Sequence, residues 1–478
     1  MTETPAATGR SRVLLISHDV IGKTMAGPGI RYYHLAAELA RHVDLTLAVR
    51  ADDGPPPPLL QAEGQSVPVT GYSRGDWPSL QPAAAAADVI ILPTDTATEF
   101  PQLADLPAAL VIDGYDPLMA EWLALFSDLP EPQRSAAWDK RMAELHVQYR
   151  MGDRFLCASE RQRYWWLGQL EAAGRLHPAA FAADPGLHNL VMVTPYGLRS
   201  TPPVHREPVV RGVWPGIGPN DKLVLWGGGL WPWLDPVTAI RAAGRIRRQR
   251  PDVKLIFPGT RHPNPAMAGM PTRNAAAMAC AEELALRGTT VFFGDWVDYE
   301  LWPSLLLECD VALTLHYDTV ETQLAFRSRL FDYIWAGLPT VATTGDATSD
   351  LVRQYGLGRV VDYEDDAAVA AAVLDLLAQD DIASFDDARR ALSWSSAAAS
   401  LVEFCRAPSR APDRPQGPAP LAPYCRQEQT HVTARLAEAD ARIDELNALV
   451  EGYANGRVMR LLNRIAYWQQ RLQGGRHE

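Results

Sequence analysis

Short apolar runs alternate with amphipathic stretches along most of the chain, and this alternation limits the fold more than any other feature. The first apolar run, residues 12–17, is followed by a loop and by residues 30–41, whose apolar side chains recur at helical spacing. Repeated strand–helix units favour a mostly parallel sheet with helices on both faces. Further strands of this first sheet are predicted at residues 43–49, 88–93, 109–114, 153–159 and 190–196.

A second series of the same kind follows residues 197–222, which are rich in Pro, Gly, Arg and Val and lack periodicity, as a linker would. This α/β pattern predicts two Rossmann-like parallel-sheet domains with a ligand cleft between them. We place the first domain over residues 1–200 and the second over residues 216–385. The strands of the second domain are predicted at residues 223–226, 253–257, 291–293, 311–316, 340–343 and 359–361.

The C-terminal part differs in composition from the two domains. Residues 406–423 are rich in proline and poor in apolar side chains, which predicts an extended linker before a helical tail over residues 424–478. Apolar residues at alternating spacings of four and three over residues 432–453 predict a short coiled coil, and with it a homo-oligomer. A helix packed on the protein's own surface is the alternative.

Residues 457–472 have a second helical pattern. Apolar side chains, Trp468 among them, fall on one face, and arginines fall largely on the other. This pattern predicts a basic amphipathic helix that is attracted to an anionic membrane surface. A solvated helix that caps an oligomer is the alternative.

The overall composition is that of a soluble globular protein. Of the 478 residues, 47% are hydrophobic, and the formal net charge of −12 argues against nucleic acid as a partner of the main body. No apolar run approaches the roughly 18 residues of a membrane-spanning helix, and residues 1–10 lack the apolar core of a signal peptide. We therefore expect a cytoplasmic protein that is peripheral at the inner face of the membrane where its basic helix binds lipid. The cysteines form no Cys-x-x-Cys pair, so no metal site is predicted from them.

Glycine-rich loops follow the first strand of each domain. Gly27 and Gly29 precede a predicted helix whose exposed N–H groups favour an anion such as phosphate, with a simple tight turn as the alternative. Gly228 and Gly229 lie in a loop that lets a ligand approach the backbone closely. Ser17 stands where a P-loop requires its first glycine, and neither loop has the third glycine of a dinucleotide fingerprint. A P-loop NTPase and an NAD enzyme are therefore not favoured.

The most informative stretch is residues 321–339. A polar loop leads here into a helix that is predicted to begin near Ala325 and to end at Gly337. The junction gathers Glu321, Arg327 and Asp332 at one end of the sheet. Arginine can neutralise a diphosphate, and a carboxylate can accept hydrogen bonds from sugar hydroxyls.

This stretch resembles the family 4 retaining glycosyltransferases of the GT-B fold, in which a carboxylate begins a segment that ends in Gly-x-Pro. The resemblance implies that Asp332 binds the ribose of the nucleotide. It also implies that Glu321 contacts the transferred sugar, because Leu324 occupies the position of the family's other glutamate. Thr194–Gly197 resembles the family's Pro-x-Gly at the end of the first domain, and Phe293–Val297 resembles the loop that holds the nucleobase.

The resemblance assigns the remaining site residues. The basic pair that the family carries after the first strand of the second domain is absent, so Arg261 and Arg327 are expected to bind the diphosphate instead. Asp113 and Asp116 follow a predicted strand of the first domain, where they would act at the sugar or the acceptor, with helix capping as the alternative for Asp116. His18 is expected on the acceptor side. The residues expected to bind the donor are Gly27, Gly29, Gly228, Gly229, Trp296, Val297, Glu321, Phe326 and Asp332.

The predicted function is transfer of a sugar from a nucleotide-diphosphate sugar to a glycan, lipid-linked or natural-product acceptor, with retention at the anomeric carbon. Arginines and loop N–H groups would stabilise the leaving diphosphate, so neither a metal ion nor a cofactor is expected. The resemblance further implies that residues 386–405 form a helix that crosses back onto the first domain. The alternatives are a nucleotide-sugar 2-epimerase and a degenerate, non-enzymatic transferase subunit that assembles through the coiled coil.

Overall fold

A computed structural model describes residues 9–51, 55–267, 269–379 and 385–414, together with residues 438–439, 441–450, 452, 456 and 465 of the tail. The chain divides into two compact units, Met1–Pro415 and Gln416–Glu478. Among the described residues, no helix has the length and apolar character needed to cross a membrane.

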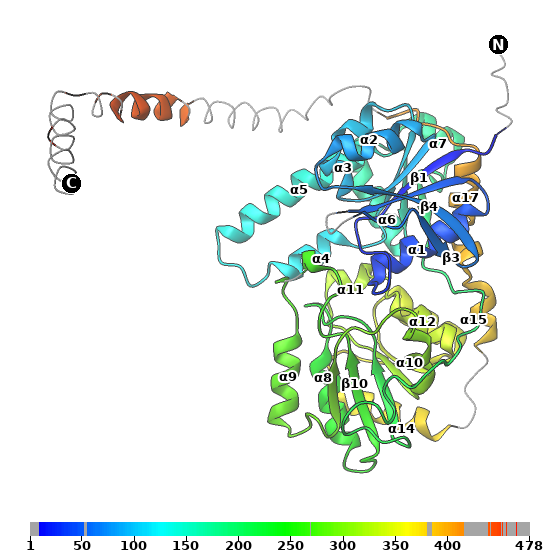
Figure 1. Ribbon diagram of the computed structural model, residues 1–478. Helices are drawn as coiled ribbons and strands as arrows, with labels where there is room; N and C mark the ends of the chain where they lie inside the picture. The colour runs from blue at the N-terminus through cyan, green and yellow to red at the C-terminus, as the bar shows by residue number, and fades with distance from the viewer. Residues whose placement is uncertain are drawn as a thin grey trace, which may run out of the picture. The chain divides into compact units, whose positions relative to one another are not determined.

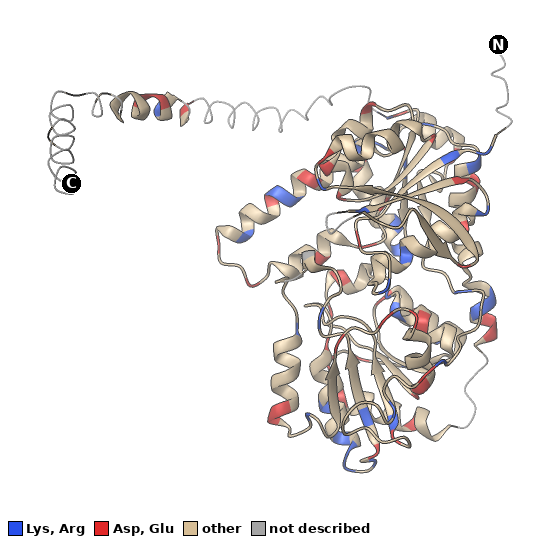
Figure 2. Cartoon of the chain, viewed as in Figure 1, with Lys and Arg blue, Asp and Glu red and all other residues tan. Residues whose placement is uncertain are grey.

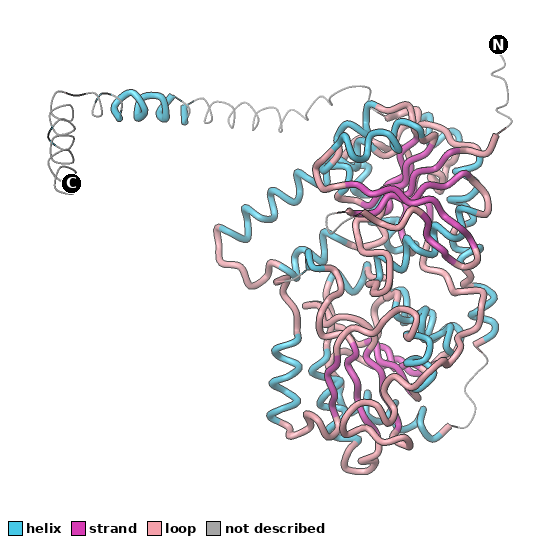
Figure 3. Tube along the Cα trace, viewed as in Figure 1, coloured by secondary structure: helices cyan, strands magenta, loops and turns pink. Residues whose placement is uncertain are grey.

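The first unit contains two separate sheets, each with helices packed around it (Figures 1 and 3). The strands are largely free of charged side chains, which lie mostly on helices and loops (Figure 2). The first sheet has the strand order β3-β4-β2-β1-β5-β6-β7-β8 and the second the order β11-β10-β9-β12-β13-β14. The prediction of two Rossmann-like parallel-sheet domains is confirmed.

The strands of the first sheet are parallel except for the hairpin of β3 and β4. They are β1 (Arg12–Ile16), β2 (Asp44–Arg50), β3 (Leu59–Ala62), β4 (Gln65–Tyr72), β5 (Val89–Pro93), β6 (Ala109–Asp113), β7 (Arg154–Cys157) and β8 (Val191–Val193). The second sheet is parallel throughout. Its strands are β9 (Lys222–Trp226), β10 (Val253–Pro258), β11 (Val291–Gly294), β12 (Val311–Thr314), β13 (Thr340–Thr343) and β14 (Gly358–Val361).

The helices connect successive strands. Those of the first domain are α1 (Gly27–Ala40), α2 (Trp77–Ala86), α3 (Thr96–Glu99), α4 (Leu118–Leu125), α5 (Gln133–Met151), α6 (Glu160–Ala172) and α7 (Pro178–Ala183), with a short 3-10 turn at Pro101–Asp105. Those of the second domain are α8 (Pro236–Ile246), α9 (Asn274–Glu283), α10 (Trp302–Glu308), α11 (Val320–Leu324), α12 (Arg329–Ala336), α13 (Ala347–Tyr355) and α14 (Asp366–Ala378), with a 3-10 turn at Pro265–Met267.

Local sequence explains where these elements begin and end. Every residue of β5 is buried, as expected for a central strand covered on both faces. Helix α8 begins at Asp235, whose carboxylate accepts a hydrogen bond of 3.0 Å from the backbone N–H of Thr238. Helix α12 ends at Gly337, whose φ of 73° lies in the left-handed region that glycine adopts without strain.

The chain returns from the second domain to the first through three short helices, where the sequence suggested one. They are α15 (Asp386–Ala391), α16 (Trp394–Ala397) and α17 (Ala399–Arg406). Helix α15 packs against α12, α16 against α1, and α17 against β8. The backbone N–H of Leu198 donates to the carbonyl of Leu392 at 2.7 Å, which ties the interdomain segment to this return path.

Residues 411–414 fall inside the predicted extended linker but pack on the first domain. Arg414 reaches Asp153 at 2.6 Å, and Asp413 reaches Arg175 at 2.6 Å, with all four side chains buried. Asp153 also accepts a hydrogen bond from the backbone N–H of Leu110 in β6. These contacts anchor the end of the first unit to the first sheet.

The tail predictions fall largely outside the described residues. Ile443, Leu446 and Val450 lie on a helix and are exposed, whereas Val432, Leu436 and Tyr453 of the same heptad pattern are not described. Of the predicted basic helix over residues 457–472, only Ile465 is described. The coiled coil and the membrane-binding helix stay predictions.

Candidate active site

A cavity of about 710 Å³ lies between the two domains and is lined by residues from both. The first-domain wall comes from the β1–α1 loop, the β6–α4 loop, α4 and α5. The second-domain wall comes from the β9–α8 and β11–α10 loops and from the α11–α12 junction. The predicted site residues that line this cavity are His18, Gly27, Asp116, Gly228, Gly229, Trp296, Val297, Glu321, Phe326, Arg327 and Asp332. Gly29, Asp113 and Arg261 are outside the lining.

The β1–α1 loop is held at the cavity by the second domain. The backbone N–H of Tyr299 donates to the carbonyl of Lys23 at 2.8 Å, and the indole N–H of Trp296 donates to the carbonyl of Met25 at 3.2 Å. Gly29 serves this packing rather than a ligand, because a Cβ at Gly29 would lie 2.2 Å from the carbonyl oxygen of Val20. The loop is therefore positioned by its own close packing and by the opposite domain.

Asp113 has a structural partner. Its carboxylate forms two hydrogen bonds, of 2.8 and 2.9 Å, with the guanidinium of Arg31, and both side chains are fully buried. Arg31 also donates to the carbonyl of Thr194 at 2.9 Å. The pair therefore joins α1 to the ends of β6 and β8, which corrects the expectation that Asp113 would act at the sugar.

Asp116 lines the cavity as predicted. Burial raises its pKa to about 7, against the hydrogen bond with Tyr115 and the charge of His18, which lower it. A carboxyl group with this pKa is partly protonated near neutral pH, so it can either donate or accept a hydrogen bond. His18 lies 4.0 Å from Asp95, and its Nδ1 has no hydrogen-bond partner among the described residues.

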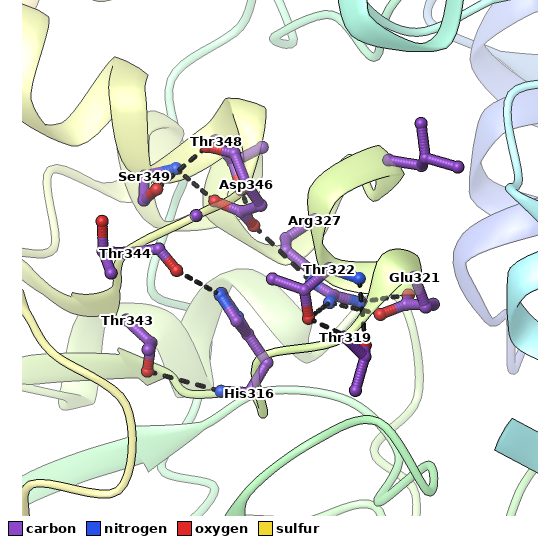
Figure 4. Close-up of polar contacts among 12 residues, drawn as sticks. His316, Thr319, Glu321, Thr322, Arg327, Thr343, Thr344, Asp346, Thr348 and Ser349 are labelled. Atoms are coloured by element: carbon purple, nitrogen blue, oxygen red, sulfur yellow. Dashed lines mark hydrogen bonds and ion pairs between the residues drawn. The ribbon is translucent and has the colours of Figure 1, made fainter. Parts of the chain in front are cut away.

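Arg327 and Glu321 form a buried pair in the second-domain wall (Figure 4). Two hydrogen bonds of 2.7 Å join them, and Asp346 lies 3.6 Å from Nε of the same guanidinium. Burial raises the pKa of Glu321, whereas Arg327 lowers it. Because Glu321 and Asp346 already neutralise the guanidinium of Arg327, this group would gain little from binding a diphosphate.

The residues around this pair have partners of their own. Asp346 caps α13 by accepting a hydrogen bond of 2.6 Å from the backbone N–H of Ser349 and one of 2.7 Å from the hydroxyl of Thr348 (Figure 4). His316 contacts the carbonyl of Thr344 at 3.0 Å through Nε2. Burial and the charge of Arg327 lower the pKa of His316 to about 4, so this imidazole is neutral at physiological pH.

Arg329 is the cation that the sequence analysis missed. It lines the cavity and makes no ion pair with any described residue, and its Nη1 is buried without a hydrogen-bond partner. Its guanidinium lies beside the glycine loop, because a Cβ at Gly228 would be 3.5 Å from Nη2. Burial lowers the pKa of Arg329 to about 10. Such a group gains most from an anion that enters the cavity.

Arg261 is exposed and is not among the residues that line the cavity, whereas Arg329 is. A signal for Arg329 emerges only once the start of α12 is known, because the sequence predicts a helix that begins near Ala325. The first turn of a helix disfavours cations, because its backbone N–H groups carry partial positive charge. Arg329 is the first residue of α12, and an arginine there is more readily explained by an anionic ligand than by helix stability.

Asp332 lies on the next turn of α12 and also faces the cavity. Its carboxylate accepts a hydrogen bond of 2.9 Å from the indole N–H of Trp302, and burial raises its pKa. Arg199 lies 3.7 Å from the other carboxylate oxygen. The guanidinium of Arg199 stacks between Tyr299, at 4.5 Å, and Trp335, at 4.1 Å, so it is held rigidly; the sequence analysis did not identify it.

Aromatic rings complete the second-domain wall. Trp231 and Trp233 stack with their centroids 5.6 Å apart, and His262 lies 5.6 Å from both Trp231 and Trp296. Gly259 leaves room for the Trp296 ring, since a Cβ there would approach it to 3.2 Å. Flat ring faces of this kind suit a nucleobase or a sugar ring.

Comparisons with known proteins identify the fold. No protein-family model and no curated protein sequence matches the chain. Sucrose-phosphate synthase from Thermosynechococcus elongatus is 16% identical, with a TM-score of 0.53 over 83% of this chain and 98% of that one. α,α-Trehalose 6-phosphate synthase from Burkholderia multivorans is 14% identical, with a TM-score of 0.53 over 83% and 98%. Anabaena HepE in complex with UDP-glucose is 14% identical, with a TM-score of 0.50 over 83% and 95%. The chain therefore has the GT-B fold of glycosyltransferases.

Proposed function

We propose that this chain is a glycosyltransferase that moves a sugar from a nucleotide-diphosphate sugar to a glycan, lipid-linked or natural-product acceptor, with retention at the anomeric carbon. The observation that carries the proposal is Arg329, a half-buried cation beside a glycine loop in the interdomain cavity, whose Nη1 is buried and which has no ion-pair partner among the described residues. A diphosphate would supply the missing anion. The GT-B fold, which known sugar-nucleotide enzymes share, supports the same function.

The donor would lie along the second-domain wall. Arg329 and the backbone of Gly227–Gly229 would hold the diphosphate, and Asp332 would accept hydrogen bonds from the ribose hydroxyls. Trp296 and Val297 would flank the nucleobase. This order follows the wall from the α12 N-terminus toward the β11–α10 loop and leaves the first-domain wall for the acceptor.

Catalysis would depend on stabilising the leaving diphosphate as the glycosidic bond breaks. Arg329 and the glycine-loop N–H groups are fixed before the reaction, so they would compensate the developing charge without a large rearrangement. We propose that this arrangement makes the transfer independent of metal ions. The Arg327–Glu321 pair would contact the transferred sugar through Glu321.

The tail would place the enzyme near its acceptor. We propose that residues 432–453 join copies of the chain and that residues 457–472 bind an anionic membrane surface on the cytoplasmic side. A lipid-linked acceptor would then lie in the membrane to which the tail binds.

A thermal-shift panel of UDP, GDP, dTDP and ADP, with magnesium and with EDTA, tests the donor site. A ligand that binds only the native state raises its melting temperature. We expect one diphosphate to stabilise the protein equally under both conditions. Arg329→Gln should weaken its binding about tenfold or more, because a hydrogen bond to a charged group contributes about 1.5–3 kcal/mol. The matched control is Arg248→Gln, an exposed arginine of the same domain.

Stabilisation by none of the four diphosphates, or equal affinity in the Arg329→Gln variant, would contradict the proposal. If one diphosphate stabilises the protein, the nucleotide sugar with the same base should be turned over in the presence of an acceptor. NMR of the product then gives the anomeric configuration. Retained configuration supports the mechanism, whereas epimerised donor without transfer would indicate the 2-epimerase.

A further inference from the structure

The first-domain wall of the cavity carries acidic side chains that its neighbouring cations do not neutralise. Asp19, Asp116 and Glu121 all line the cavity, and we call them the acidic wall. The arginine nearest to Glu121 on this domain, Arg141, reaches another carboxylate, that of Glu144, at 3.3 Å. Arg74 and Lys140 line the same wall, and His262 of the second domain is close enough to Asp19 for their charges to interact. Among the described residues, no cation forms an ion pair with Asp19, Asp116 or Glu121.

Asp19 independently indicates a missing partner. Its side chain is buried, with 5% of the residue exposed. One carboxylate oxygen accepts a hydrogen bond of 2.7 Å from the side-chain amide of Asn264 on the opposite domain. The other oxygen is buried and receives no hydrogen bond from the described residues. Because a buried carboxylate needs donors on both oxygens, a ligand in the cavity fits as the second donor.

Burial is the main influence on the pKa of the other two members. Burial raises the pKa of Asp116 to about 7, and burial followed by the charge of Asp116 raises the pKa of Glu121 well above its usual range. A cation in the cavity would stabilise both ionised carboxylates. The groups that already act on Asp116 are Tyr115, His18, Asp113 and Arg31, and those that act on Glu121 besides Asp116 are Glu321, Arg327 and Arg141.

We propose that the acceptor carries an ammonium group, as an amino sugar or an aminocyclitol does, and that the acidic wall binds this group. The inference rests on the proposed function, because it assigns the first-domain side of the cavity to the acceptor. The donor diphosphate and the acceptor ammonium then occupy opposite walls, at Arg329 and at Asp19, Asp116 and Glu121. Opposite charge on the two walls keeps each substrate in its own half of the cavity.

Binding of the ammonium group has a proton signature. At pH 7 Asp116 is partly protonated, and a bound cation shifts its carboxyl group toward the ionised form. Protons are therefore released to the buffer as the amine binds. A polyol that offers only hydroxyl groups brings no charge and releases no protons.

Isothermal titration of the full-length chain tests this inference. The protein is titrated at pH 7 with 2-deoxystreptamine or with myo-inositol, in PIPES and in HEPES, whose different ionisation enthalpies report proton release. The titrations are run without nucleotide and with the diphosphate that the thermal panel selects. We expect the aminocyclitol to bind at least about tenfold more tightly than the polyol and to release protons on binding.

Variants of the acidic wall give the second readout. Asp19→Asn and Glu121→Gln should each weaken binding of 2-deoxystreptamine about tenfold while binding of the nucleoside diphosphate stays unchanged. The matched control is Glu171→Gln, an exposed carboxylate on α6 of the same domain. Unchanged amine affinity in both wall variants would overturn the assignment.

The outcomes separate this inference from the proposed function. Nucleotide binding without amine binding, or equal binding of the two cyclitols, overturns the ammonium site and leaves the transferase proposal standing. Amine binding without any nucleotide binding supports the ammonium site and contradicts the transferase. A competition experiment distinguishes whether the ammonium group belongs to the acceptor or to the transferred sugar. The competitor is a C-glycosidic analogue of nucleotide-diphosphate glucose with the base that the thermal panel selects. If it displaces 2-deoxystreptamine, the ammonium belongs to the transferred sugar and the acceptor assignment is overturned.

Discussion

Arg327 and Glu321 are joined by two hydrogen bonds of 2.7 Å inside the cavity wall, with Asp346 only 3.6 Å from the same guanidinium. A single arginine therefore neutralises two carboxylates that are each 1% exposed. The guanidinium of Arg327 therefore stabilises the folded state rather than binding a ligand. For a substitution of Arg327, the free energy of unfolding should be measured before the nucleotide affinity.

Replacing Arg327 with Met should lower the free energy of unfolding by about 3–5 kcal/mol, because it leaves buried carboxylates without a partner. Urea denaturation at pH 7 measures the loss. The difference in free energy of unfolding between the wild type and the variant should be smaller at pH 5, where the unpaired carboxyl groups take up protons. The control is Arg353→Met, whose exposed ion pair with Asp350 should contribute about 0–1 kcal/mol. A stable Arg327→Met protein that has lost nucleotide binding would instead give Arg327 the ligand role.

Asp116 should make the protein less stable as the pH rises. Its pKa is raised to about 7 in the folded chain, so between pH 4 and 7 the folded state binds more protons than the unfolded state. The free energy of unfolding therefore falls over this window and levels off above it. Asp116→Asn removes the effect. As the pH rises from 4.5 to 8, the free energy of unfolding of the variant should therefore increase by about 2–4 kcal/mol relative to that of the wild type. Parallel urea titrations at the two pH values measure this, and a constant difference would mean an ordinary pKa.

The central strands of both domains could be predicted because their apolar runs report burial directly. The hairpin of β3 and β4 was not predicted, because its burial alternates and a proline, Pro68, interrupts the pattern. Pro68 is tolerated because it is paired only with Leu59 of the edge strand β3, while the pairing of β4 with β2 begins at the next residue, Val69. The pattern of residues was informative where a strand is covered on both faces and uninformative where it is not.

The sequence could not predict which of two neighbouring arginines lacks an ion-pair partner. Arg327 and Arg329 are separated only by Ser328, and spacing alone does not say which one a carboxylate neutralises. That depends on the break between α11 and α12, which turns Arg327 toward Glu321 and leaves Arg329 at the start of a helix. Asp113 was misjudged for a similar reason, because its partner Arg31 is distant in the sequence.

Gly29→Ala should destabilise the β1–α1 loop. A Cβ at this position would meet the carbonyl oxygen of Val20 at 2.2 Å, so the backbone must move. Strain of this kind costs about 1–3 kcal/mol, and we expect a lower melting temperature. Gly22→Ala, in the β1–α1 loop before this helix, is the matched control, since nothing lies within 4 Å of its Cβ position. Equal melting temperatures for the two variants would contradict this packing.

Two truncations separate the anchor of the first unit from the tail. A chain that ends at residue 423 keeps the buried pairs of Asp413 with Arg175 and of Arg414 with Asp153, so its free energy of unfolding should match that of the full chain. A chain that ends at residue 410 leaves Arg175 and Asp153 without their ion-pair partners and should lose about 3–5 kcal/mol or more. The longer truncated chain also lacks the predicted coiled coil and basic helix. Light scattering should show a smaller oligomer than the full chain forms, and binding to vesicles of anionic lipid should be lost. If its oligomeric state and vesicle binding are unchanged, self-association and membrane binding reside in the first unit, and the heptad pattern has another use.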